Sequence, residues 1–220
     1  MIDAIFVPRG AEERAVRNAL RGHGTPAVWT SGIGPAAAQR AVAEALEAGA
    51  PGAALVVGLC GLLSPAFAVG DLLLYATVTR ADGATLRCDA ELAAKLAQLL
   101  GRAQTGVAAY SSDSIVTRSA DKEALAKRYH VGAVDMESFA FVEGLQQAGT
   151  RVAVLRVGSD GVAEDLPDLG RGVDAEGDLS GSALAFVMLS NPFAGARMAV
   201  HGLRALGQLE RALRFIVPKT

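Results

Sequence analysis

Short apolar runs alternate along the chain with longer segments in which apolar residues recur at helical spacing. The apolar runs predict strands at residues 4–7, 26–29, 53–57, 72–78, 105–110 and 152–155. The helical spacing predicts helices at residues 11–21, 36–47, 90–100, 121–129 and 193–215. Because strands and helices alternate, we expect an α/β fold: a three-layer α/β/α arrangement around a twisted central mixed sheet.

Length and charge narrow this expectation. A chain of 220 residues is short for two cores, so we expect a single domain over residues 1–220, with a C-terminal helical extension at about 181–216. Hydrophobic residues make up 51% of the chain, which is enough for a sizeable core. The net charge of −2 argues against nucleic-acid binding, which requires a basic surface.

Cysteine usage and the N-terminus bear on cofactors and location. Cys60 and Cys88 make neither a disulfide framework nor a zinc site, so we expect no metal and no cofactor. The N-terminus lacks a basic segment followed by an apolar one, and no apolar run reaches the length of a membrane span. These patterns are typical of a cytoplasmic protein.

The most informative stretch runs from Ala133 to Gly161 and predicts a strand end, a helix and a second strand. Glu137 begins the helix, and Asp160 follows the apolar run at residues 152–155. In open α/β sheets ligands bind beyond the carboxyl ends of the strands. We therefore expect Glu137 and Asp160 to share one crevice.

Two motifs in this stretch, Val134–Ser138 (VDMES) and Val157–Asp160 (VGSD), resemble the paired signature of the nucleoside phosphorylase and nucleosidase family. The resemblance extends over most of the chain up to Asp160. It implies a phosphorylase-like fold and cleavage of the N-glycosidic bond of a purine nucleoside, most simply an adenine nucleoside. It also implies that Met136 and Glu137 hold the ribose and that Asp160 protonates N7 of the purine.

The chemistry of this reaction suits such a pair of carboxyl groups. Cleavage gives the sugar oxocarbenium character and sends negative charge to the leaving base. A protonated acid at N7 makes the base a neutral leaving group, and such proton donation contributes roughly 10² to 10⁴ in rate. Glu137 can accept hydrogen bonds from ribose hydroxyls and favour the developing cation. Taken singly, Glu137 is better explained as a helix-start acid and Asp160 as a turn residue; the pair in the family pattern favours the functional interpretation.

The family places further groups near the first strand. A glutamate there activates the attacking water, and either Glu12 or Glu13 matches it; both are also explained as acids that complement the helix dipole. An arginine there binds phosphate in the phosphorylases, which suits Arg9, although a solvated loop arginine is the simpler interpretation. Gly34, in a Gly-x-Gly turn before a helix, is a second candidate for contact with phosphate.

Other segments are predicted to line the substrate. Cys60 and Gly61 lie in the glycine-rich turn of the family, Ser159 precedes the acid, and Ile115 and Val116 occupy the segment that covers and reads the base. Cys60 is better explained as a buried structural thiol than as a nucleophile. Val56 and Leu59 replace an arginine and a small polar residue that bind phosphate in other members, which favours water as the nucleophile.

The leading hypothesis is hydrolysis by a purine nucleosidase. A phosphate-dependent nucleoside phosphorylase and a non-catalytic nucleoside-binding protein are the alternatives. The expected partners are the nucleoside, phosphate in the second case, and further copies of this chain in a homo-oligomer.

The C-terminal region resembles the hopanoid-associated phosphorylase subgroup, in the loop Glu164–Leu169 and in the helix that follows. That resemblance implies a 5′-modified adenosine such as adenosylhopane. On a helical wheel the polar stripe comprises Arg197, His201, Arg204, Gln208 and Arg211, and the opposite face comprises Met198, Leu203, Leu206, Leu209, Leu213 and Ile216. The simpler interpretation is a terminal helix with a solvated basic face. The alternative is a helix that borders the pocket or rests weakly on a membrane surface.

Overall fold

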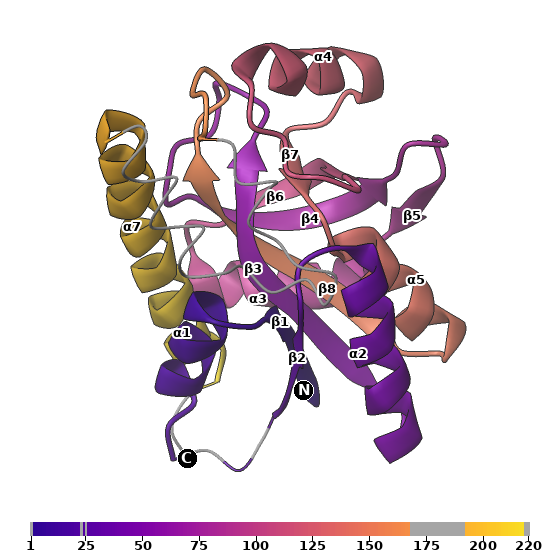
Figure 1. The fold of residues 1–220 in the computed structure, drawn as a ribbon. Coiled ribbons are helices and arrows are strands. Elements are labelled where there is room, and N and C mark those ends of the chain that lie inside the picture. The colour runs from indigo at the N-terminus through magenta and orange to yellow at the C-terminus, as the bar shows by residue number, and fades with distance from the viewer. Residues whose placement is uncertain (1, 23, 25, 168–191, 218–220) are drawn as a thin grey trace.

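The computed structural model describes residues 2–22, 24, 26–167 and 192–217 (Figure 1). Its strands are β1 (Ala4–Pro8), β2 (Ala27–Ser31), β3 (Ala53–Leu62), β4 (Leu72–Thr79), β5 (Thr85–Arg87), β6 (Gln104–Ser111), β7 (Ala133–Asp135) and β8 (Arg151–Asp160). Its helices are α1 (Ala11–Ala19), α2 (Pro35–Ala48), α3 (Ala90–Leu100), α4 (Ser119–Tyr129), α5 (Ser138–Gln147) and α7 (Pro192–Ile216). The part of the predicted C-terminal extension before residue 192 lies outside the described residues.

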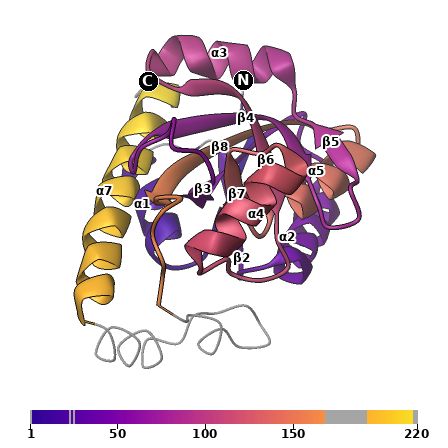
Figure 2. The same cartoon turned by 90° about the horizontal axis from the view of Figure 1, so that it is seen from above.

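Helices cover both faces of the central sheet, so the predicted three-layer α/β/α fold is confirmed (Figure 1 and Figure 2). Helices α2 and α5 pack on one face, and α1, α3 and α7 pack on the other. Helix α4 lies at one end of the sheet, where its apolar residues pack near β6 and β7.

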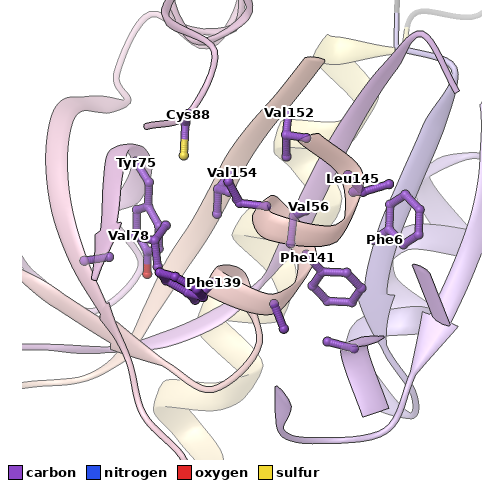
Figure 3. Close-up of a cluster of buried hydrophobic side chains, with 14 of the residues drawn as sticks. Phe6, Val56, Tyr75, Val78, Cys88, Phe139, Phe141, Leu145, Val152 and Val154 are labelled. Atoms are coloured by element: carbon purple, nitrogen blue, oxygen red, sulfur yellow. The ribbon is translucent and has the colours of Figure 1, made fainter. Parts of the chain in front are cut away.

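The core on the α2 and α5 face is built from large side chains of sheet and helix (Figure 3). The rings of Phe6 and Phe141 lie 5.4 Å apart between centroids. Phe6, Val56, Phe141 and Val154 are each no more than 1% exposed. Burying a side chain of this size contributes about 1.5–3 kcal/mol, so this cluster anchors α5 firmly on the central strands.

Five of the strands close into a ring. Strand β3 pairs in parallel with β8, β8 antiparallel with β4, β4 in parallel with β6, β6 in parallel with β7, and β7 antiparallel with β3. Strands β1 and β2 extend the sheet from β3, and β5 adds to β4. The alternating pattern of the sequence predicts a mixed sheet, as observed, but it contains no sign of this closure.

Strands β3 and β8 continue past the apolar runs that predict them, which end at Val57 and Leu155. They stay paired up to Gly61 and Asp160, with a register shift between Cys60 and Gly61. Glycine suggests a turn when it is met in a sequence, but here it provides room within a strand. A Cβ atom at Gly158 would lie 2.7 Å from Leu62 Cδ2. The glycines therefore allow close packing at the end of the ring where β3 and β8 end.

Helix α7 is an integral part of the core. Its residues Ala205, Leu209, Ala212 and Leu213 are no more than 2% exposed and pack in one cluster with α1, α3 and the sheet. The helical wheel was wrong for Leu203, which is 71% exposed, because the contact surface follows the small residues Ala205 and Ala212. None of the described helices combines the length and apolar character that a membrane crossing requires.

Candidate active site

A cavity of about 280 Å³ lies where β3, β7 and β8 meet. The residues that line it are Pro8, Glu12, Ile33, Leu59, Cys60, Gly61, Ser114, Ile115, Val116, Val134, Asp135, Met136, Glu137, Arg156, Ser159, Asp160, Leu166, Met198 and Gly202. Those predicted from the sequence are Glu12, Cys60, Gly61, Ile115, Val116, Met136, Glu137, Ser159 and Asp160. Arg9, Glu13 and Gly34 lie outside this lining.

Glu137 and Asp160 line the same cavity for a reason that differs from the expected one. Strand β7 lies beside the carboxyl end of β3 but runs antiparallel to β3 and β8, so the site is not formed by the ends of parallel strands. Instead, Gly61 of β3 pairs with Val134 of β7 on one side and with Asp160 of β8 on the other. The chain then continues from β7 along the cavity to Glu137. Gly61 is therefore the residue of β3 that lies between the segment leading to Glu137 and the segment that carries Asp160.

Asp135 holds the start of helix α5 in place. Its Oδ1 atom accepts hydrogen bonds from the backbone amides of Glu137 at 3.1 Å and Ser138 at 3.0 Å, and from Ser111 Oγ at 3.1 Å. Its Oδ2 atom accepts from Ser138 Oγ at 2.6 Å. Asp135 therefore satisfies the free amides of the helix N-terminus and fixes the direction in which Glu137 projects.

Arg156 is completely buried beside this network. Its Nη2 atom donates to Ser138 Oγ at 3.0 Å and to Glu137 Oε2 at 3.4 Å, and its Nε atom lies 3.4 Å from Asp135 Oδ2. Burial lowers the pKa of the Arg156 guanidinium, but Asp135 and Glu137 outweigh burial and hold the pKa above its ordinary value. Arg156 is thus a permanent cation whose donors are taken up by groups of the protein, as expected for an in-strand arginine.

Gly58 makes room for this buried cation. A Cβ atom at Gly58 would lie 2.2 Å from Arg156 Nη1 and 2.7 Å from Glu12 Oε1. No other residue type fits there without displacing one of these two side chains. Gly58, which the sequence suggests is part of a turn, is therefore the residue at which β3 passes between the side chains of Glu12 and Arg156.

Glu137 occupies the N-terminus of helix α2. Its Oε1 atom accepts a hydrogen bond of 2.9 Å from the backbone amide of Gly34, the residue that precedes α2. The Gly34 residue is a candidate for phosphate contact in the sequence, but its amide already donates to a carboxylate of the protein. Burial raises the pKa of Glu137, and Arg156 opposes that shift. Met136, the neighbour of Glu137, lines the cavity beside it.

The structure separates Glu12 from Glu13. Glu12 lines the cavity and its Oε1 atom accepts a hydrogen bond of 2.7 Å from the Leu59 amide. Burial raises the pKa of Glu12 to about 7, against the opposing effects of Leu59 and Arg156. Glu13 instead forms an ion pair of 2.8 Å with Arg17 on the surface of α1. Arg9 is an exposed residue of the turn before α1.

Asp160 has two side-chain partners. Ser159 Oγ lies 2.8 Å from Asp160 Oδ1 and 3.1 Å from the carbonyl oxygen of Cys60. Lys122 of helix α4 places its Nζ atom 2.5 Å from Asp160 Oδ2. The sequence offers no signal for Lys122, because a lysine between Asp121 and Glu123 on a polar helix is typical of a solvated face.

The remaining walls of the cavity are apolar. Ile115 and Val116, from the loop after β6, form one of them. Leu166 and, from α7, Met198 and Gly202 form another, so the C-terminal helix does border the cavity. Cys60 is buried, and burial raises the pKa of its thiol, which therefore stays protonated.

The charge of the cavity decides which ligands it suits. Of the described residues in its lining, Glu12, Asp135, Glu137 and Asp160 are carboxylic acids and Arg156 is the one cation. Such a surround stabilises positive charge that develops on a bound molecule. Among the described residues, no group of histidine, cysteine and acidic side chains is arranged to hold a metal ion.

Solved structures of bacterial nucleosidases share the fold. The 5′-methylthioadenosine/S-adenosylhomocysteine nucleosidase of Helicobacter pylori superposes with a TM-score of 0.74 at 17% identity, covering 97% of each chain. The futalosine hydrolase of the same species gives a TM-score of 0.75 at 16% identity over 98% of this chain and 97% of that one. The S. pneumoniae 5′-methylthioadenosine/S-adenosylhomocysteine nucleosidase gives 0.65 at 20% identity over 95% and 100%.

A comparison with curated proteins found no match to the chain. The sequence itself matches the phosphorylase superfamily over residues 3–180, a span that contains both the VDMES and the VGSD motifs. This match agrees with the resemblance carried by those motifs and with the shared fold. The chain belongs to the phosphorylase superfamily.

Proposed function

We propose that the protein hydrolyses the N-glycosidic bond of a purine nucleoside, with adenine as the leaving base. Asp160 delivers a proton to N7 of the purine, Glu137 binds the ribose hydroxyls, and Met136 packs under the sugar. Glu12 takes a proton from the attacking water. The observation that carries this proposal is that Glu12, Glu137 and Asp160 line one cavity from three different elements.

The pKa of Glu12 supports its part in the reaction. A general base works best when its pKa lies near the pH at which the enzyme operates, and burial brings the pKa of Glu12 to about 7. Its hydrogen bond from the Leu59 amide holds the carboxyl group against the cavity. A water molecule between Glu12 and the sugar is therefore well placed to lose a proton as it attacks.

Water is favoured over phosphate because Arg156, the cation among the described residues of the cavity lining, is already engaged. Phosphate sites offer free amides or guanidinium groups to the anion. Arg156 already contacts Glu137, Ser138 and Asp135, and the Gly34 amide already donates to Glu137. An incoming phosphate would also meet the carboxylates of the cavity, which repel it.

The apolar wall supports a substrate with an apolar group at C5′. Leu166, Met198 and Gly202 present no charged or hydroxyl side chain to the cavity. Solved structures with this fold include one with 5′-methylthioadenosine in the active site, from a H. pylori nucleosidase. Adenosylhopane, which the C-terminal resemblance implies, is the extreme case of such a substrate.

The test is base release in the presence and absence of phosphate. Adenosine, 5′-methylthioadenosine and longer 5′-alkylthioadenosines are supplied in phosphate-free buffer, and adenine and sugar products are separated. We expect adenine and free sugar without phosphate, and Arg9→Ala within about twofold of wild type, as for most surface substitutions. Strict dependence on phosphate with formation of a sugar 1-phosphate would identify a phosphorylase. Binding without any base release would identify a nucleoside-binding protein.

A further inference from the structure

A buried lysine lies behind Asp160. Lys122 is a residue of helix α4, yet its side chain is 0% exposed. Its Nζ atom lies 2.5 Å from Asp160 Oδ2, 2.9 Å from the carbonyl oxygen of Gly161 and 2.9 Å from the carbonyl oxygen of Glu164. Lysine is almost never fully buried unless it is paired, so this placement calls for an explanation.

Counting donors and acceptors gives the charge of the lysine. An ammonium group has three N–H donors, and Lys122 has three acceptors around it. A neutral amine would point its lone pair at one of these oxygens. Lys122 is therefore an ammonium ion while the site is empty, and its partner Asp160 is a carboxylate. Asp160 then holds no proton of its own to give to a leaving base.

The hydroxyl of Ser159 suits both protonation states of Asp160. It carries one proton and has two acceptors in reach, Asp160 Oδ1 at 2.8 Å and the Cys60 carbonyl oxygen at 3.1 Å. When Asp160 is ionised, Ser159 donates to it. When Asp160 carries a proton on Oδ2, its Oδ1 atom is still an acceptor, and Ser159 can keep donating to Oδ1 or turn to the Cys60 carbonyl. The acid is thus supported before and after it receives a proton.

Other charged groups near Lys122 are engaged elsewhere. Glu164 pairs with Arg197 of α7 at 3.5 Å, and His201 Nδ1 lies 3.3 Å from the same carboxylate oxygen. Asp165 accepts a hydrogen bond from the Ser119 amide, which lowers its pKa, and the nearby charges of Arg118 and Lys122 lower it further. Asp160 is thus the carboxylate in direct contact with Lys122.

We propose that Lys122 and Asp160 act together as the acid of the reaction, with the Lys122 ammonium supplying the proton that Asp160 passes to N7. The inference rests on the proposed function. The Nζ–H bond breaks as Oδ2–H forms; then Oδ2–H breaks as N7–H forms, and the electrons of the glycosidic bond go to the purine. Lys122 is left as a neutral amine, and its two remaining N–H groups donate to the Gly161 and Glu164 carbonyls.

The proton balance closes over one turnover. Water attacks the sugar and its proton goes to Glu12, while the proton from Lys122 leaves on the neutral purine. Glu12 then loses its proton to solvent and Lys122 takes one from solvent, which restores the starting state. Lys122 acts through Asp160 and is a positioning and proton-supplying residue; it does not line the cavity.

The test compares Lys122→Met and Lys122→Arg with the wild type by kcat and KM between pH 5 and 10, with 5′-methylthioadenosine as substrate. Lys127→Met is the matched control, because Lys127 is on the same helix, exposed, and paired with Glu123 at 3.6 Å. We expect both Lys122 variants to lose about 100-fold or more in kcat at pH 8, with KM little changed. The control should match the wild type.

The pH profiles distinguish proton supply from a structural or purely electrostatic role. The rate of Lys122→Met relative to the wild type should recover in part toward pH 5.5, because Asp160 can then take a proton from solvent, whereas the protonation of Glu12 slows both enzymes alike. Lys122→Arg should stay slow at every pH, because arginine keeps Asp160 ionised and does not release a proton. A fast Lys122→Arg enzyme would show that charge alone suffices, and an equal loss for Lys122→Met at every pH would show a structural role. Either result overturns the inference.

Folding of the variants is checked by thermal unfolding and by equilibrium binding of adenine. Should Lys122→Met not fold, Lys122→Arg and the wild-type profile still decide. A wild-type kcat that already declines with rising pH below pH 8 would contradict a lysine as the source of the proton. No base release by the wild type from any nucleoside would overturn the proposed function and this inference together, whereas a normal wild type with fast variants overturns the inference alone.

Discussion

Asp160 is in contact with Ser159 and Lys122, and its acid group can be removed with little change in the shape of the side chain. Asp160→Asn keeps the size of the side chain and removes the acid. We expect turnover to fall at least about 100-fold, with the Kd for nucleoside changed only slightly. Steady-state kinetics and calorimetry measure the two quantities. Asp113→Asn, in the exposed loop after β6, is the control; an Asp160→Asn enzyme within a fewfold of wild type would exclude the acid role.

Glu12 gives a prediction with a defined pH. A base must be ionised to accept a proton, and the pKa of Glu12 is raised to about 7 by burial. The wild-type rate should therefore rise with pH through about 7 and level off above it. Glu12→Gln should lose this limb together with most of the activity, whereas Glu13→Gln, which breaks only the surface pair with Arg17, should keep both. A loss with Glu13→Gln and none with Glu12→Gln would reverse the assignment.

Single residues differ in how far the sequence determines them. Glu137 and Asp160 stand in motifs, and both line the cavity. Glu12 and Glu13 are adjacent on one helix, so only the packing of α1 decides which of them points inward. Lys122 is invisible in the sequence, because its burial depends on the carbonyls of Gly161 and Glu164, which are remote in the chain.

At the scale of elements, helix α7 offers a test of the substrate. Gly202 lines the cavity, and a Cβ atom there would meet nothing within 4 Å. Gly202→Leu should therefore fill space that an apolar 5′ group would occupy. We expect kcat/KM for long 5′-alkylthioadenosines to fall at least about tenfold, since one misfitting methylene in a pocket costs 10-fold or more. The value for adenosine should change little.

Gly207→Leu is the matched control for that experiment. Gly207 is on the same helix, has equal room for a Cβ atom and is not part of the cavity lining. Both substitutions raise helix propensity by a similar amount, so differences between them report on the cavity. An equal fall for adenosine and for the alkylthio substrates would place the 5′ group elsewhere.

Elements were predictable where their pattern is local. The apolar runs place β1, β2, β3, β4, β6 and β8, and the stretch from Ala133 to Gly161 predicts β7. Strand β5 is missed, because it is three residues long and contains no apolar run. The ends of β3 and β8 escape prediction because glycine there serves packing against Arg156 and Leu62. The contact face of α7 also escapes it, since small residues such as Ala205 and Ala212 determine where a helix approaches a sheet closely.

At the scale of the whole molecule, the sequence predicts the three layers of helices and sheet but not the closure of five strands into a ring. Alternating strands and helices predict a mixed sheet with helices on both faces, and that is observed. The ring arises because β8 pairs with both β3 and β4 while β7 pairs with both β3 and β6. These are pairings between segments remote in sequence. The sequence pattern is equally compatible with an open sheet, so it does not reveal these pairings. For the same reason it does not reveal why Glu137 and Asp160 lie in one cavity.

Helix α7 meets the cavity from outside the ring, and this has a consequence for how such an enzyme changes over time. Met198 and Gly202 shape one wall, whereas Glu137 and Asp160 follow from pairings centred on Gly61. Mutation on the cavity side of α7 can alter the outline of the cavity and leave the carboxyl groups where they are. Substrate preference and the reaction can thus change independently, and a library of α7 variants selected on new nucleosides should yield altered preferences without loss of the proposed hydrolysis.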